Sequence, residues 1–460
     1  MRKLIIFIII CSSVKNVNAQ TISQKIATAY KQFENDSQLK HAISSLYVID
    51  AATGKVVFDR NSQIGLAPAS SQKIITAATA FELLGKDYRY KTEFYISSDS
   101  GKSFLVIKPS GDPTLGSWRW SQTKEDVVFN RIVSAIRKTN AMLSWPIFFD
   151  GSSWNSESIP NGWIWQDIGN YYGAGAELIN WQENQFDIKL QSGSKTGELV
   201  KIIGTTPDLY NYKLSSQVTA APKGSGDNAY VYFPVNGSEG IIRGTIPVNE
   251  KSFTISGSFP SAKTEFENIL VDSLTRIIGK PNFLSSVTAL YQRDINGKLI
   301  YTEISPALDS IIYWLLKKSI NLYGEALLKT MGFEKRGFGA TDTGINVIKD
   351  FWKLKGIDPD ELNIYDGSGL SPMNRVTTHV QVEILKYAKK QSWFRYFYDA
   401  LPEYNAMKLK SGTIGDVKAF CGYHTSKSGK NYIISFIVNN YSGSSSTLVN
   451  KMYRVLDVLK

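Results

Sequence analysis

The sequence predicts a multi-domain α/β protein in which the first and last segments form one domain around a β-rich insertion. Mixed helix and strand patterns occupy residues 21–86 and the chain beyond about residue 300, whereas short alternating strands fill the region between. At 460 residues the chain is too long for one ordinary hydrophobic core, so two or three domains are expected. A hydrophobic content of 43% and a charged content of 20% are typical of a soluble globular protein.

The N-terminus, MRKLIIFIIICSSVKNVNAQ, has the features of a cleavable secretory signal in residues 1–19. A basic start precedes an apolar run from Leu4 to Cys11, and Val17-Asn18-Ala19 provides a cleavage site. The apolar run is too short for a comfortable membrane span. We therefore expect an exported, periplasmic protein. Removal of the signal leaves Cys421 as the one cysteine, so stability must come from large cores rather than disulfides.

The formal net charge is +11 at pH 7. Such a charge suits a protein that works beside anionic polymers or lipid surfaces, but the basic residues are scattered along the chain. Because charged residues usually form a solvated face, we favour simple solubility, with peripheral association with the wall or membrane as the alternative. No nucleic-acid partner is expected.

The predicted elements follow in chain order. A polar-faced helix at residues 21–40 precedes two strands, SSLYVIDAAT and KVVFDR, and a buried helix in APASSQKIITAATAFELLG. The middle region contains the strand patterns YKTEFYISS, SFLVIKPSGDPTL, WPIFFDGS, FDIKLQ, ELVKIIG and AYVYFPV. The last part contains the helices ALDSIIYWLLKKSINLYGEALLKTMG, INVIKDFWKLKG and HVQVEILKYAKK, the strands DVKAFCGYH and NYIISFIVNN, and a helix near STLVNKMYRVLDVLK.

Ser70 and Lys73 stand at the start of the first buried helix, whose apolar face includes Ile74, Ala77 and Phe81. A lysine is unfavourable there, because the N-terminal end of a helix is positive and because the ammonium must be desolvated. Residues three apart share a helical face, so the amine can reach the hydroxyl. Burial and nearby cations lower the pKa of a lysine, which allows its neutral amine to act as a base toward serine. The alternative is that Ser70 is an N-cap.

Serine chemistry that depends on histidine is not supported. The chain has only His41, His379 and His424, and no G-x-S-x-G motif occurs. Scattered histidines with one thiol, and no H-E-x-x-H motif, argue against a protein-bound metal. We therefore expect neither a metal nor an organic cofactor.

The S-x-x-K spacing alone is weak, because it also occurs at Ser37, Ser121 and Ser192. Ser37 lies in a polar stretch, Ser192 lies in a turn, and Ser121 has no long apolar helix behind it. Only Ser70 begins a buried helix.

Enzymes of the Ser-x-x-Lys class also need a Ser-Asp-Asn-like element and a Lys-Thr-Gly-like element. Ser319-Ile320-Asn321 follows in a helical context, and Lys410-Ser411-Gly412-Thr413 precedes a strand. Serine in place of threonine keeps the hydroxyl, Gly412 permits a close approach to a ligand, and Thr413 adds a donor. Lys195-Thr196-Gly197 and Lys427-Ser428-Gly429 are explained as turns between strands.

With these elements in order, the sequence resembles the penicillin-binding protein 4 type of D-alanyl-D-alanine carboxypeptidases and endopeptidases, which are class C low-molecular-mass penicillin-binding proteins. The resemblance extends over nearly the whole mature chain and includes PSGDPTL, GWIWQDIGNYYGA, NWQEN and YDGSGLS. It implies a β-lactamase/transpeptidase-like α-β-α domain interrupted by two inserted domains. The implied boundaries are residues 20–86 and 303–460 for the catalytic domain, 87–178 and 266–302 for domain II, and 179–265 for domain III.

The resemblance also implies the chemistry. Ser70 would attack the carbonyl between two D-alanine residues of a peptidoglycan stem peptide, with Lys73 as base. Ser319 and Lys410 would carry the proton to the leaving amine, and Asn321 would bind the substrate amide. The N–H groups of Ser70 and Thr413 would form the oxyanion hole, and the residues Ser411, Gly412 and Thr413 would bind the terminal carboxylate. β-Lactams would acylate Ser70 covalently.

Substrate choice depends on other positions. In the family, the residues that match Asp167 and Tyr172 line a pocket for the side-chain ammonium of the peptide. Without the resemblance, we would interpret Asp167 as a cap in a loop and Tyr172 as an aromatic residue of the core. Members that recognise diaminopimelate closely have arginine after the serine that matches Ser371, where this chain has Pro372, and Arg375 is the nearby candidate to replace it.

Two functions of different class remain open. One is a periplasmic serine hydrolase, a carboxypeptidase or an endopeptidase. The other is a catalytically weak penicillin-binding or wall-binding scaffold. The intact set of Ser70, Lys73, Ser319, Asn321 and Lys410 favours the enzyme, because a scaffold need not keep all five.

Overall fold

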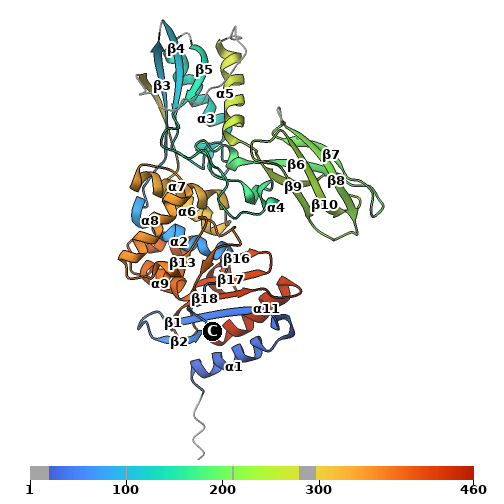
Figure 1. Cartoon of the computed structure of the whole chain (residues 1–460), viewed down its shortest axis with the longest axis vertical. Coiled ribbons are helices and arrows are strands. Elements are labelled where there is room, and N and C mark those ends of the chain that lie inside the picture. The colour runs from blue at the N-terminus through green and yellow to red at the C-terminus, as the bar shows by residue number, and fades with distance from the viewer. Residues whose placement is uncertain (1–19, 100, 140, 142, 210–211, 279–296) are drawn as a thin grey trace, which may run out of the picture.

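The structure is a computed structural model that describes residues 20–99, 101–139, 141, 143–209, 212–278 and 297–460. The signal predicted in residues 1–19 lies outside the described residues. Both ends of the chain contribute to one antiparallel sheet of six strands (Figure 1). In spatial order the strands are β15 (Glu403–Tyr404), β16 (Met407–Ile414), β17 (Val417–Thr425), β18 (Asn431–Asn439), β1 (Ile43–Asp50) and β2 (Val56–Arg60).

Helices cover both faces of this sheet. Alternate residues of β1 enter different cores: Leu46 and Val48 pack on one face, and Tyr47 and Ile49 pack on the other. The first face is covered by α1 (Ile22–Glu34) and α11 (Ser445–Leu456). The second face is covered by α2 (Lys73–Leu84), α6 (Leu308–Lys317), α7 (Asn321–Arg336), α8 (Thr341–Leu354), α9 (Thr378–Ala388) and α10 (Phe394–Ala400).

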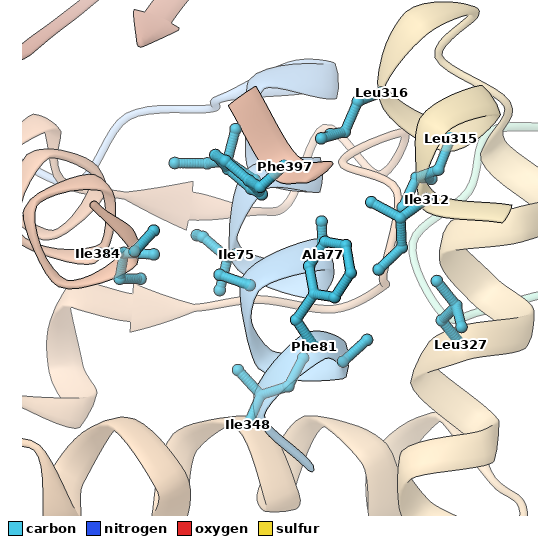
Figure 2. Close-up of a cluster of buried hydrophobic side chains, with 14 of the residues drawn as sticks. Ile75, Ala77, Phe81, Ile312, Leu315, Leu316, Leu327, Ile348, Ile384 and Phe397 are labelled. Atoms are coloured by element: carbon cyan, nitrogen blue, oxygen red, sulfur yellow. The ribbon is translucent and has the colours of Figure 1, made fainter. Parts of the chain in front are cut away.

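The helix α2 lies at the centre of the second layer, and every residue from Lys73 to Phe81 is buried. Figure 2 shows Ile75, Ala77 and Phe81 among aliphatic side chains of the surrounding helices. The ring of Phe81 also stacks on Trp393, with centroids 5.0 Å apart. The 3₁₀ turn η2 (Ala69–Gln72), which leads into α2, contacts β16, so the start of this buried helix lies beside that strand.

The inserted region contains three smaller sheets. One has the order β12 (Gly297–Ile304), β3 (Lys91–Asp99), β4 (Lys102–Lys108) and β5 (Leu143–Phe149). The other two are β8 (Lys213–Ala221), β10 (Glu239–Pro247) and β9 (Asn228–Tyr232), and β11 (Phe253–Ser258), β6 (Gln185–Gln191) and β7 (Lys201–Thr206). In Figure 1 the four-stranded sheet lies above the helices α6 to α8, on the side away from the six-stranded sheet, and the other two sheets lie to the right of these helices.

The sequence of the inserted region shows mainly the alternating pattern of strands, and it did not predict two helices that the structure contains. α3 (Glu125–Lys138) and α5 (Ala262–Ile278) pack on the four-stranded sheet and supply Ile132 and Phe266 to its core. α3 also begins shortly after Ser121, where no helix was predicted. The domain boundaries remain a proposal, supported by separate hydrophobic cores in the three parts. A boundary just before Ala262, rather than at 265/266, would keep α5 whole.

The short remaining elements are strands β13 (Leu362–Asn363) and β14 (Arg375–Val376), the helix α4 (Trp165–Ile168), and single 3₁₀ turns. Over the parts of the chain described above, no helix is both long and apolar enough to cross a membrane.

Candidate active site

Ser70 lies in a 3₁₀ turn, η2 (Ala69–Gln72), that leads directly into α2. The residue before it, Ala69, is buried and has a φ of +46°, a strained conformation of the kind that is often found at functional sites. The Ser70 hydroxyl does not cap the helix; its Oγ lies 2.9 Å from Lys73 Nζ. The structure therefore places the Ser70 hydroxyl within hydrogen-bond distance of the Lys73 amine.

The side chain of Lys73 is fully buried. Besides Ser70, its Nζ contacts Asn321 Oδ1 at 2.6 Å and the carbonyl oxygen of Ser368 at 2.7 Å. Burial, followed by the nearby charge of Lys410, holds the pKa of Lys73 well below its usual value. Burial and the charge of Lys410 therefore favour a neutral amine.

The Ser319–Asn321 element is not inside one helix, as the apolar pattern had suggested. α6 ends at Lys317 and α7 begins at Asn321, and Ser319 between them has a φ of +59°. This break aims Ser319 Oγ at Lys410 Nζ, 2.9 Å away. Asn321 accepts from Lys73 and donates through Nδ2 to the carbonyl oxygen of Tyr172 at 2.7 Å.

Lys410 lies within β16, not before a strand as predicted. Its buried Nζ donates to Ser319 Oγ and to the carbonyl oxygen of Ser411. Burial lowers the pKa of Lys410 to about 7. Ser319 therefore lies between a buried lysine and the catalytic cavity.

Gly412 allows β16 to approach the turn that carries Ser70. A Cβ at this position would come within 2.5 Å of the carbonyl oxygen of Pro68 and 3.0 Å of the Ser70 nitrogen. Beyond Lys408, no strand among the described residues pairs with the outer edge of β16, since β15 covers only Met407 and Lys408. Peptide N–H and C=O groups at such an edge can bind an extended ligand.

The two hydroxyls of this strand segment differ. Thr413 lines the cavity described below, and its Oγ1 accepts from Lys418 Nζ at 2.6 Å. The Ser411 hydroxyl donates to the Tyr404 hydroxyl at 3.1 Å, and Ser411 is not among the cavity-lining residues. The structure thus brings Thr413 to the site but leaves the Ser411 side chain outside it.

Behind Lys73 lies a buried carboxyl group that sequence reasoning missed. Glu325 is fully buried, and its Oε2 accepts from the Gly367 N–H at 3.0 Å while Oε1 has no partner among the described residues. Burial, together with the charge of Asp366, raises the pKa of Glu325 to about 8. The only available signal was that Glu325 lies four residues after Asn321, on the same helical face.

A cavity of about 790 Å³ opens in front of these groups. The predicted residues on its wall are Ser70, Asp167, Tyr172, Ser319, Asn321 and Thr413. Tyr172 donates a hydrogen bond to Asp167; burial raises the pKa of this carboxyl, and the hydrogen bond partly opposes that effect. Lys73 and Lys410 are not on the wall: Lys73 contacts the wall residues Ser70 and Asn321, and Lys410 contacts Ser319.

The other candidates lie elsewhere. Lys195 and Lys427 are exposed in turns, and Lys124, three residues after Ser121, is also exposed. The Arg375 guanidinium donates to the carbonyl oxygens of Pro372 and Asn374, and Arg375 does not line the cavity. Pro372 does line it, so the side chain at the family's arginine position offers no charge.

Known proteins resemble this chain along most of its length. A family model described as the D-Ala-D-Ala carboxypeptidase 3 (S13) family matches residues 23–457. A D-alanyl-D-alanine carboxypeptidase of Actinomadura sp. (strain R39) is 26% identical over 448 residues, covering 90% of this chain and 81% of that protein. The D-alanyl-D-alanine carboxypeptidase DacB of Haemophilus influenzae is 20% identical over 412 residues, covering 84% and 83%.

The fold is also that of a solved structure. The crystal structure of penicillin binding protein 4 (dacB) from Haemophilus influenzae matches with a TM-score of 0.79 at 19% sequence identity, covering 94% of this chain and 98% of that one. This match confirms the predicted multi-domain α/β fold. The family match over residues 23–457 shows that the chain belongs to the D-Ala-D-Ala carboxypeptidase 3 (S13) family.

Proposed function

We propose that this serine-type D-Ala-D-Ala carboxypeptidase or endopeptidase cuts peptidoglycan stem peptides with Ser70 as its nucleophile. Membership of the S13 family supports the activity. The observation that carries the residue assignment is the 2.9 Å contact between Ser70 Oγ and the fully buried Nζ of Lys73. A wall-binding scaffold would not need a buried amine at that distance.

The first step is removal of the Ser70 proton. A neutral lysine amine has two hydrogens and one lone pair. With the hydrogens on Asn321 Oδ1 and on the carbonyl oxygen of Ser368, the lone pair would be left to accept the proton of the Ser70 hydroxyl, whose Oγ is 2.9 Å from Nζ. As the Ser70 oxygen attacks the peptide carbonyl, its proton passes to Lys73.

The second step is departure of the leaving group. The bond between the carbonyl carbon and the amine breaks, and the Ser319 hydroxyl supplies a proton to the amine. Lys410 Nζ, 2.9 Å from Ser319 Oγ, replaces that proton. The acyl group stays on Ser70 while Lys73 gives up its proton to solvent and Lys410 regains one. Water then attacks the acyl carbon and gives a proton to Lys73, which returns it to Ser70 Oγ as the acyl bond breaks.

The substrate lies along the open edge of β16. The N–H groups of Ser70 and Thr413 stabilise the oxyanion that develops on the carbonyl oxygen. The charge of Lys410 attracts the terminal carboxylate, and the Thr413 hydroxyl, on the cavity wall, donates to it. Ser411 would have to leave Tyr404 before it could take part.

An enzyme that cuts peptidoglycan acts outside the cytoplasm, because its substrate lies there. We propose that this enzyme is located in the periplasm. β-Lactams resemble the terminal dipeptide and should acylate Ser70. The penicillin binding protein 4 of Haemophilus influenzae has been crystallised as a complex with a β-lactam, which supports this expectation.

The first prediction concerns acylation. Ser70→Ala should abolish covalent labelling by a fluorescent penicillin, because Ser70 Oγ is the hydroxyl in contact with the fully buried amine of Lys73. Labelling is measured by gel fluorescence, and the modified residue is identified by peptide mass spectrometry. Ser121→Ala and Ser192→Ala are matched controls that should label normally. Labelling that survives in Ser70→Ala would refute the assignment.

The second prediction concerns Lys410 and pH. The acylation rate should have a bell-shaped pH dependence. On the acid side the rate falls as Lys73 gains a proton. On the alkaline side the rate falls as Lys410 loses its charge, above a pKa of about 7 in the free protein. A bound carboxylate stabilises the charged form of Lys410, so it moves this alkaline decrease to higher pH.

Lys410→Ala should lower the acylation rate about 10²- to 10⁴-fold and remove the alkaline limb, because the carboxylate then has no titrating partner. Stopped-flow kinetics with one penicillin across the pH range measures both effects. Lys195→Ala and Lys427→Ala serve as controls. An alkaline limb that persists in Lys410→Ala would assign it to another group.

The third prediction concerns the third residue of the stem peptide. If Asp167 receives its side-chain ammonium, lysine peptides should be hydrolysed roughly ten- to a hundred-fold faster in kcat/KM than acetyl-lysine peptides, since a charge-assisted hydrogen bond contributes about 1.5–3 kcal/mol. Asp167→Asn should remove most of this preference and leave penicillin labelling nearly intact. Equal rates on the two peptides with the unmodified protein would exclude Asp167 from recognition.

A further inference from the structure

Arg119, in the inserted region, lines the catalytic cavity. Its Nε and Nη2 donate to the two carboxylate oxygens of Glu183 at 2.7 and 2.9 Å. The guanidinium carbon also lies 5.0 Å from the centre of the Trp314 ring on α6. The Arg119 side chain is still 16% exposed, so these contacts do not enclose it fully.

The position of Arg119 is fixed by an unusual piece of backbone. Gln182, Glu183 and Asn184 have consecutive positive φ values of 50°, 53° and 54°. This conformation is costly for residues other than glycine and persists only where its surroundings impose it. Glu183 Oε1 also accepts from Ser117 Oγ and Tyr323 OH, both at 2.8 Å, so the carboxylate that holds Arg119 is itself fully bonded.

Lys318 is a second cation on the same cavity wall. Its backbone N–H donates to the carbonyl oxygen of Trp314, which places it one helical turn beyond the ring that supports Arg119. The Lys318 side chain is exposed and has no ion pair among the described residues. Lys318 immediately precedes Ser319, so this cation lies next to the serine that is proposed to protonate the leaving amine.

We propose that Arg119 and Lys318 form an anion subsite that binds a carboxylate of the peptide on the acyl side of the scissile bond. The inference rests on the proposed function. The terminal carboxylate belongs at Lys410 and Thr413, so a second anion must come from another part of the substrate.

The charges on the cavity wall are consistent with a zwitterionic peptide. The wall carries Asp167 and Asp416 as well as Lys318 and the Arg119–Glu183 pair. An ammonium at Asp167 leaves the cations for a carboxylate. Two substrate carboxylates share this chemistry: one on the side chain of the third residue, as in diaminopimelate, and one on a glutamate at the second residue.

The test compares two pairs of synthetic peptides that end in D-Ala-D-Ala. One pair has diaminopimelate or lysine at the third residue, and the other has glutamate or its amide at the second. In at least one pair, the carboxylate-bearing peptide should have a roughly five- to tenfold higher kcat/KM, as expected for a partly exposed charge-assisted contact. The pair that responds identifies the source of the carboxylate.

Lys318→Met should lower that ratio at least threefold, and Lys318→Arg should retain it. Lys317→Met is the matched control, because the neighbouring lysine does not line the cavity, and it should leave the ratio unchanged. Arg119→Lys should also lower the ratio, since a single ammonium cannot bond both carboxylate oxygens of Glu183 as the guanidinium does and so loses its fixed position on the cavity wall. A ratio near one in both pairs, or a ratio that Lys318→Met does not alter, would overturn the proposal.

The same four peptides are also measured for binding to the Ser70→Ala variant by calorimetry. If the unmodified protein hydrolyses none of the four peptides but Ser70→Ala still binds the carboxylate-bearing peptides more tightly, the proposed function is contradicted and the subsite stands. If all four peptides are hydrolysed at equal rates and bound equally, the subsite is overturned and the proposed function stands.

Discussion

The burial of the Lys73 amine is the constraint on which the site depends. A charged ammonium enclosed in protein costs several kcal/mol, and this one is held by an amide oxygen, a backbone carbonyl and a serine hydroxyl rather than by a carboxylate. The buried carboxyl group of Glu325 has a pKa raised to about 8 by burial, so at neutral pH it is mostly protonated. Asp366 and Glu325 favour the charged amine, but burial and the charge of Lys410 outweigh them and hold the pKa of Lys73 well below its usual value. Lys73 is therefore suited to act as a neutral base.

The fold supplies this enclosure from distant parts of the chain. β1 pairs with β18, so the first and last segments share one sheet, and α2 is buried under the helical layer that follows the insertion. The insertion does more than separate the two halves. Its Tyr172 backbone orients Asn321, which in turn holds Lys73, and Asp167 and Arg119 stand on the cavity wall. Substrate recognition and base orientation are thereby linked through one side chain.

Local sequence rules predicted the parts of the site that depend on local geometry. The spacing of Ser70 and Lys73 and the buried helix behind them were readable because helical periodicity fixes both. The break at Ser319 was not, because the apolar pattern continues across it, and the orientation of Ser411 depends on which face of β16 is buried. The helices α3 and α5 were missed because the surrounding strands dominate the pattern. Arg119 and Glu325 reach the site only through tertiary packing, which spacing along the chain does not encode.

Direct titration of Lys73 is the sharpest test of this chemistry. The protein is labelled with ¹³C at lysine Cε, the Lys73 signal is assigned by its loss in Lys73→Arg, and its chemical shift is followed with pH by NMR. Burial and the neighbouring Lys410 predict a pKa well below the usual lysine value, with the amine neutral while Ser70 is free. A Lys73 signal that titrates like an exposed lysine, near the ordinary value of about 10.4, would contradict a neutral base and require another group to activate Ser70.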